Sequence, residues 1–373
     1  MFKLLMAGAA LLGTASAAHA QGALGANFNE QAQDVDFNEL KRAEASWLHL
    51  QLNMPHLDRA PPAANGAVKT VLSASAAGFK TMFSLRFPYS DRDFPGAGTP
   101  ELEHEFRRID AVLPVVMGKV DILIIGADPY IDSRLADRDL DLNAFYEAVA
   151  ARVIAYRKAN CADACKTRLF MAGPNRLDIK SYQSPSTARW MDYVRATPEI
   201  EGVGLRMYLP NLGASKAFLD YTLPRMRPEQ KFVVPDFSLV WSWIPNLKTN
   251  IPPAFADKYQ APRNAQTWQI VRAALETPFS KAQWDEFLSQ TKWIDSNKHY
   301  LQQQMKLFRD TGRLAVATYA FKQGKSLRTD FDATRQPWLL HTIYADRTAK
   351  RNPDGTAAFN YRWIDDFRAL QTQ

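Results

Sequence analysis

Two aspartates, each close behind an apolar run, are the side chains in this sequence best placed to do chemistry. Asp128 follows Ile-Leu-Ile-Ile at 122–125, and Asp236 follows Phe-Val-Val at 232–234. Paired carboxyl groups can divide a reaction, because one donates a proton while the other, ionised, attacks or accepts a proton. Each also has a structural alternative, Asp128 as a cap for the next helix or loop and Asp236 as an Asx turn into Phe237. The chemical interpretation therefore depends on a fold that brings both to one place.

The elements that would position these aspartates follow a repeating pattern in which short apolar, β-branched or aromatic runs alternate with amphipathic stretches. Strands are expected at 25–28, 47–53, 81–87, 120–126, 168–172, 202–208, 231–236 and 314–321. Helices are expected at 37–45, 67–77, 100–112, 142–158, 187–196, 214–224 and within 280–311. Strands separated by helices form a parallel sheet, and eight of them in about 350 residues predict a single closed (β/α)8 TIM barrel over 21–373.

An open dinucleotide-binding sheet is the alternative for such a pattern, and no Gly-x-Gly-x-x-Gly follows the first strand to support it. The spacing is uneven late in the chain, where roughly eighty residues separate the seventh and eighth strands, so we predict an extended helical insertion there. It opens with a Trp- and Pro-rich segment. Trp241 and Trp243 lie at the strand mouth and are candidates for ligand contact, whereas Trp284 and Trp293 are expected to pack in a helical layer.

Polar and aromatic residues after each strand form a second group of candidates, because the C-terminal strand ends of a barrel meet at one face. Aromatic rings that stack on sugar faces, with Asn, Arg and Tyr hydrogen-bonding groups, suit a polyhydroxyl ligand. Each residue could equally be a satisfied structural one. Besides the two tryptophans, the group comprises Asn27, Glu30, Asn53, Arg86, Asn175, Tyr208 and Tyr319.

This order of strands and carboxylates resembles the large clan of (β/α)8 glycoside hydrolases that carry the acid/base residue after strand four and the nucleophile after strand seven. The likeness covers nearly all of the chain beyond residue 20. Where the clan typically has Gly-Asn-Glu-Pro and a context such as Thr-Glu-Phe-Ser, this sequence has Gly-Ala-Asp-Pro at 126–129 and Pro-Asp-Phe-Ser at 235–238. The resemblance implies hydrolysis of a polysaccharide or oligosaccharide, with Asp128 as general acid, Asp236 as nucleophile or base, and Tyr208 beside it.

The departures from the clan's motifs bear on mechanism. Aspartate is one methylene shorter than glutamate, so two such replacements retract each carboxyl by roughly 1.3 Å and widen a retaining separation of about 5 Å toward the roughly 6.5 to 9.5 Å of inverting enzymes. Inversion is therefore a hypothesis beside retention. Ala127 replaces an Asn that in the clan hydrogen-bonds the sugar hydroxyl next to the scissile carbon. The alternative function is a non-catalytic barrel that binds polysaccharide in its export, assembly or surface attachment.

The N-terminus has the layout of a cleaved secretory signal peptide over residues 1–20. Lys3 precedes an apolar run at 4–12, and Ala-His-Ala ends the segment at 18–20. The run is too short to span a bilayer as an uncleaved anchor. We therefore expect a periplasmic or secreted protein. In such a compartment Cys161 and Cys165 are expected to form a local disulfide, since neither a second Cys pair nor a neighbouring His completes a metal site.

Other classes of function lack support in the sequence. Neither a Gly-x-Ser-x-Gly elbow nor a His-Glu-x-x-His motif is present, which argues against hydrolase triads and zinc proteases. The net charge of +7 is spread in doublets instead of a basic tract, so no nucleic acid partner is predicted. No cofactor, metal or stable membrane insertion is predicted, and the expected partner is carbohydrate.

Overall fold

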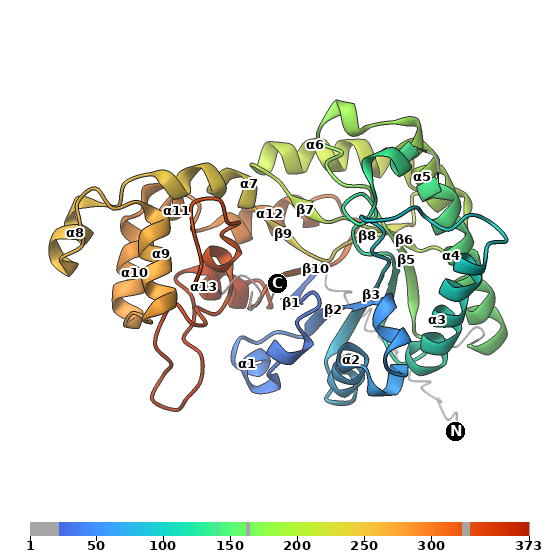
Figure 1. Ribbon diagram of the computed structural model, residues 1–373, viewed down its shortest axis with the longest axis horizontal. Coiled ribbons are helices and arrows are strands. Elements are labelled where there is room, and N and C mark those ends of the chain that lie inside the picture. Colours follow the sequence, from blue (N-terminus) through green and yellow to red (C-terminus); the bar gives the residue numbers. More distant parts are fainter. Residues whose placement is uncertain (1–21, 140, 162–164, 323–328, 373) are drawn as a thin grey trace, which may run out of the picture.

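A closed barrel of eight parallel strands forms the centre of the protein in a computed structural model that describes residues 22–139, 141–161, 165–322 and 329–372 (Figure 1). The predicted signal peptide lies outside the described residues. The first strand pairs with both the second and the last, which closes the barrel and confirms the predicted fold. The barrel strands are β1 (Ala23–Asn27), β2 (Trp47–Asn53), β3 (Lys80–Arg86), β4 (Ile122–Ile125), β5 (Arg168–Ala172), β6 (Gly202–Gly204), β8 (Lys231–Val234) and β10 (Leu314–Ala320).

Two of the predicted strands are interrupted in the structure. The expected strand 202–208 splits into β6 and β7 (Met207–Tyr208), and the expected 231–236 ends at Val234 before β9 (Phe237–Ser238). Pro235 explains the second break, since a proline has no N–H to continue the ladder. The short strands β7 and β9 pair with each other apart from the barrel sheet. Arg206 and Asp236 therefore lie at these breaks, where the chain leaves the barrel wall.

Helices alternate with the barrel strands as predicted, and their ends follow local capping signals. The side chains of Asp36, Asn65, Thr99, Ser184 and Asn211 each accept a hydrogen bond from an amide in the first turn of the helix that follows. The helices between the barrel strands are α1 (Phe37–Arg42), α2 (Gly66–Ala76), α3 (Pro100–Val116), α4 (Asp141–Asn160), α5 (Pro185–Ala196) and α6 (Leu212–Thr222), and α12 (Tyr300–Arg309) precedes β10.

The inside of the barrel changes from apolar to polar toward the C-terminal strand ends. Its apolar layer contains Met82, Ile122, Ile124, Phe170, Ala172, Val233 and Val316. Above this layer the buried His49 ring meets Asn27 Oδ1 at 2.7 Å through Nδ1 and Ser84 Oγ at 2.9 Å through Nε2. Burial and the nearby charge of Arg206 lower the pKa of His49 well below its usual value, so the ring is neutral. Because side chains alternate along a strand, Gln51 and Arg86 point inward one layer closer to the mouth.

The predicted insertion between β8 and β10 is confirmed as a group of helices beside the barrel, drawn in yellow and orange in Figure 1. The C-terminal segment packs into it: Trp284 is buried and donates from Nε1 to Asn360 Oδ1 at 3.0 Å. One apolar cluster runs from the barrel helices through this lobe. The lobe contains α7 (Val240–Trp243), α8 (Pro253–Tyr259), α9 (Thr267–Glu276), α10 (Lys281–Gln290), α11 (Lys292–Asp295) and α13 (Trp363–Ala369).

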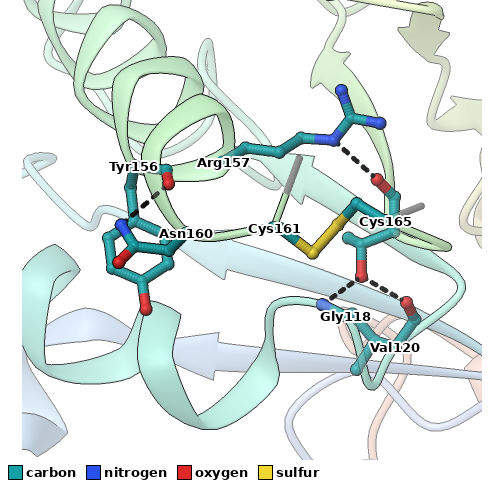
Figure 2. The surroundings of a disulfide bond; sticks show 8 residues. Gly118, Val120, Tyr156, Arg157, Asn160, Cys161 and Cys165 are labelled. Atoms are coloured by element: carbon teal, nitrogen blue, oxygen red, sulfur yellow. Dashed lines mark hydrogen bonds between the residues drawn. A yellow bond between two sulfur atoms is a disulfide. The ribbon is translucent and has the colours of Figure 1, made fainter. Parts of the chain in front are cut away.

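The predicted disulfide between Cys161 and Cys165 is present, and Cys161 directly follows the end of α4 (Figure 2). Next to it, Arg157 Nε donates to the Thr167 carbonyl, and the Thr167 hydroxyl joins Val120 and Gly118. These contacts lie just before β4 and β5 in the chain, so the bridge is at the end of the barrel opposite the strand mouths. Across the described ranges no helix has the length and apolar character to cross a membrane, and no three His, Cys, Asp or Glu side chains group as metal ligands.

Candidate active site

A cleft of about 650 Å³ opens over the C-terminal ends of the barrel strands. Every barrel strand or the loop behind it contributes to the lining, as expected for a site at this face of a TIM barrel. The predicted candidates Glu30, Arg86, Asp128, Asn175, Tyr208 and Trp241 all line the cleft. Its other walls come from Asn29, Gln31, Gln51, Ile131, Arg206, Asp330, Phe331, Thr334, Arg335, Gln336 and Trp338.

Asp128 lies in the cleft wall and is 8% exposed. Gly126 lets the chain turn out of β4 toward it: this glycine has φ +94°, and a Cβ there would lie 2.9 Å from the Tyr146 ring. The Asp128 carbonyl then accepts from the amides of Ile131 and Asp132, which fixes the turn. Burial raises the pKa of Asp128 to about 6, with Asp132 adding to the rise and Arg206 opposing it.

Arg206 is a buried cation that faces Asp128. Its Nε lies 3.1 Å from Asp128 Oδ1, at ion-pair distance without hydrogen-bond alignment. Its other nitrogens donate to Tyr208 Oη at 2.9 Å and to Asn29 Oδ1 at 3.1 Å. The surrounding carboxylates raise its pKa against the opposing effect of burial, so the guanidinium stays charged. Arg206 thus fixes one oxygen of Asp128 and the hydroxyl of Tyr208 in place.

Asp236 is more enclosed, at 1% exposure, and does not belong to the cleft lining. Its Oδ2 accepts from Tyr208 Oη at 2.8 Å and from Asn29 Nδ2 at 3.2 Å. Burial raises the pKa of Asp236, and the charge of Arg206 and these two donors oppose the rise. Burial also raises the pKa of Tyr208 well above its usual value, so its hydroxyl remains a donor. The two aspartates are therefore joined through Arg206 and Tyr208.

A second ion pair supports the wall beside Asp128. Arg86 donates from Nε and Nη2 to the buried Asp132 carboxylate over 2.7 to 3.2 Å. The amide of Tyr89 donates to the Asp132 carbonyl at 2.7 Å, so the loop after β3 braces the loop after β4. A paired fork of this kind fixes the guanidinium plane. The positive charge of Arg86 at the cleft is therefore neutralised by the buried Asp132 carboxylate.

Aromatic side chains form the other part of the lining. Trp241 is 45% exposed and stands at the start of the inserted lobe. On the β10 side, the Trp338 ring meets the Tyr208 ring edge-on, with centroids 4.8 Å apart. The Tyr208 ring in turn adjoins Arg206, whose guanidinium carbon lies 5.7 Å from the ring centroid. The cleft thus combines apolar faces with directional hydrogen-bonding groups.

Four predicted ligand contacts lie away from the cleft lining in the structure. Trp243, two positions after Trp241 in α7, is 1% exposed and packs against His341 and Trp363 in the lobe, since i and i+2 face different sides of a helix. Tyr319 is buried against Phe237. Asn27 belongs to the polar layer inside the barrel, and Asn53 is half-buried before the turn Met54–Asp58.

Several residues of the site were missed by sequence reasoning, namely Asn29, Gln51, Asp132, Arg206 and Trp338. Arg206 could have been found from the alternation of side chains along a strand. It lies two residues after Gly204, which faces the barrel interior, so Arg206 is expected to face inward as well. Trp338 follows β10 in a 3-10 turn without sequence periodicity, so its position depends on tertiary packing.

No protein-family model and no curated protein matches the sequence. Among solved structures, the chain is similar to a glucosidase from Croceicoccus marinus, with 13% identity, 95% of this chain and 67% of that chain covered, and a TM-score of 0.48. It is similar to a GH30 endoxylanase from Clostridium papyrosolvens C71, with 9% identity, 94% and 71% coverage, and a TM-score of 0.46. It is also similar to a psychrophilic glycoside hydrolase family 10 endo-beta-1,4-xylanase, with 12% identity, 81% of this chain and 86% of that chain covered, and a TM-score of 0.44. The fold assignment rests on the closed strand order itself.

Proposed function

We propose that this protein binds a polysaccharide or oligosaccharide in the cleft and hydrolyses a glycosidic bond there. The observation that carries the proposal is a pair of carboxyl groups at the mouth, one in the cleft wall with a pKa raised to about 6 and one enclosed beside it. Glycoside hydrolysis needs one carboxylic acid and one carboxylate. The exposed Trp241 ring and the polar lining supply the kind of surface that holds sugar rings.

Asp128 is assigned the role of general acid. A carboxyl with a pKa of about 6 keeps a substantial protonated fraction in mildly acidic solution, and its proton then goes to the leaving glycosidic oxygen. Arg206 stays charged beside it and stabilises the carboxylate that forms after the transfer. The arrangement predicts that hydrolysis declines as Asp128 loses its proton above about pH 6.

Asp236 is assigned the role of general base. Its carboxylate is shorter than a glutamate and almost fully enclosed, so we propose that it takes a proton from a water instead of attacking the sugar directly. Oδ2 is fixed by Tyr208 and Asn29, and Oδ1 accepts no hydrogen bond from the described residues. The water's oxygen bonds to the anomeric carbon while the bond to the leaving oxygen breaks. This assignment gives inversion of configuration.

Action outside the cytoplasm is part of the proposal. Residues 1–20 have the layout of a signal peptide, and a disulfide between Cys161 and Cys165 suits an oxidising compartment. Polysaccharides of the cell surface and its surroundings would then be the accessible substrates.

A second candidate function is saccharide binding without hydrolysis. Two observations favour it: the Arg206 guanidinium joins the two aspartates through Tyr208, and Asp236 is 1% exposed. Ala127 also supplies no side-chain hydrogen bond to a sugar. Under this function Arg206 and the other polar groups of the lining bind sugar hydroxyls, whereas the two aspartates only hold Arg206 and Tyr208 in place.

The test is to screen the purified protein against α- and β-linked glycans for release of reducing ends, beside Asp128→Asn and Asp236→Asn. Asp220→Asn serves as control, because Asp220 lies exposed on α6 and pairs only with Lys216 in the described chain. We expect hydrolysis that both site variants lose and the control keeps. Activity unaffected by both site substitutions overturns the assignment. Binding without turnover, unchanged by the substitutions, selects the second candidate.

A further inference from the structure

A group of buried polar atoms lies at the junction between the barrel mouth and the inserted lobe, outside the cleft lining. None of these atoms has a hydrogen-bond partner among the described residues. They come from the end of β8, from β10, from the 3-10 turn Trp338–His341, and from α7 and α11. The atoms are Asp236 Oδ1, Tyr319 Oη, His341 Nδ1 and Nε2, Trp243 Nε1 and Trp293 Nε1.

Ring contacts make these residues one continuous group. The His341 ring lies 4.9 Å from the Trp243 ring and 5.9 Å from the Tyr319 ring, centroid to centroid. Trp243 in turn lies 5.9 Å from Trp293. At the barrel end, the Tyr319 ring lies 5.1 Å from the ring of Phe237, the residue after Asp236, and the charge of Asp236 contributes to raising the pKa of Tyr319.

Hydrogen-bond donors lie at one end of the group and acceptors at the other. An indole N–H only donates and a carboxylate only accepts, whereas a neutral imidazole and a phenol can each do both. Burial lowers the pKa of His341 to about 3, so its ring is neutral at ordinary pH, with one nitrogen donating and the other accepting. From Trp293 and Trp243 through His341 and Tyr319 to Asp236, donors give way to acceptors. Such an order suits a chain of hydrogen bonds that all run the same way.

Buried polar groups in native proteins are almost always bound by protein atoms or by ordered water, and buried waters typically make about three hydrogen bonds each. Here the part of the chain that the structure describes supplies no partner, and the six atoms offer both donors and acceptors. We propose that buried water molecules bridge Trp243, His341 and Tyr319 and reach Oδ1 of Asp236 from the lobe side. Tyr319 and His341 are then positioning residues for the Asp236 carboxylate, a role that rests on the proposed function, whereas the water site itself does not.

Thermal unfolding of Tyr319→Phe tests the water site through the sign of the change. Removing a hydroxyl that is hydrogen-bonded to water lowers the stability of the folded protein, whereas removing an unpaired buried hydroxyl raises it. The matched control is Tyr344→Phe, a buried tyrosine whose hydroxyl donates to the Glu39 carbonyl at 2.9 Å. We expect Tm to fall in both variants. A Tm of Tyr319→Phe equal to or above that of the wild type overturns the proposal.

A crystal structure that resolves ordered waters gives the second readout, independent of any activity. We expect water oxygens within hydrogen-bond distance of Tyr319 Oη, a His341 nitrogen and Asp236 Oδ1. A dry junction, or side chains rotated to bond protein atoms instead, overturns the proposal. Density for a molecule larger than water there also overturns it.

The positioning role is tested by the pH dependence of kcat/KM on a hydrolysed glycan, for wild type, Tyr319→Phe and His341→Phe. Water at Oδ1 favours the charged carboxylate, so its loss raises the pKa of Asp236. The acidic limb, which reports ionisation of the base, is then expected to move to higher pH. Lower activity with an unmoved limb overturns the positioning role. If the protein hydrolyses nothing, the proposed function fails, while Tm and the crystal structure still decide the water site.

Discussion

The surroundings of Asp128 and Asp236 differ, although both aspartates follow a buried strand at the same mouth. Asp128 faces a cation, Arg206, and lies near a second ion pair between Arg86 and Asp132. Asp236 is held by two neutral donors and has aromatic rings behind it. The two carboxyl groups are of the same residue type, so their different neighbours are what support the proposed roles of Asp128 as acid and Asp236 as base.

The largest effect expected from this difference is on catalysis. Asp128→Asn should lower hydrolysis of a natural glycan by about 10²- to 10⁴-fold, because the leaving oxygen is no longer protonated. With an aryl glycoside whose leaving group needs no proton, the same variant should keep most of its activity. Asp236→Asn should lose activity on both substrates. Steady-state rates on the two substrates check this, and equal losses for Asp128→Asn on both would contradict its role as acid.

Removal of the Arg206 charge, which faces Asp128, should strongly lower the stability of the protein. Arg206→Met leaves a buried carboxylate without its charge partner, which costs about 3 to 5 kcal/mol. The loss should be larger at pH 8 than at pH 5, since Asp128 can take up a proton at the lower pH. Urea denaturation at both pH values measures it. A loss that is the same at both values would indicate that Arg206 acts through packing alone.

The pH dependence of wild-type stability tests the raised pKa of Asp128. Because the folded pKa of Asp128 is raised to about 6 from 3.8, the folded state binds more protons than the unfolded state between these values. The free energy of unfolding should therefore fall as pH rises from about 4 to above 6, by up to about 3 kcal/mol. The raised pKa values of Asp132 and Asp236 act in the same direction. Asp128→Asn should flatten much of this slope, and an unchanged slope would refute the assignment.

The smallest change in stability is expected when a hydrogen bond to Asp236 is removed. Tyr208→Phe removes one hydrogen bond to the Asp236 carboxylate and one from Arg206, and should lower stability by about 2 kcal/mol. Because the Tyr208 hydroxyl stabilises the charged form of Asp236, the loss should be larger at pH 8 than at pH 5, but by less than for Arg206→Met, since no charge is removed. Denaturation of both variants under the same conditions compares the two sides. A Tyr208→Phe loss as large and as pH-dependent as that of Arg206→Met would remove the distinction.

The barrel was predictable because its signals are local. Alternation of apolar runs with capped amphipathic helices marks each strand and helix, and Gly126 and Pro235 mark where the chain leaves the wall on the way to the aspartates. Arg206 and Asn29 were not predicted, since their contact with each other and with the aspartates depends on closure of the barrel between distant strands. Similarly, no local pattern separates Trp241 in the cleft from Trp243 in the lobe, whose positions depend on how α7 packs.

The central claim is that the cleft breaks a glycosidic bond with Asp128 as acid and Asp236 acting through water. The most direct measurement is proton NMR of the first glycan that the protein hydrolyses, which follows the anomeric configuration of the new reducing end before it equilibrates. Attack by a water opposite the leaving oxygen predicts the inverted anomer. A retained configuration, or a glycan that binds in the cleft while no new reducing end forms, would contradict it.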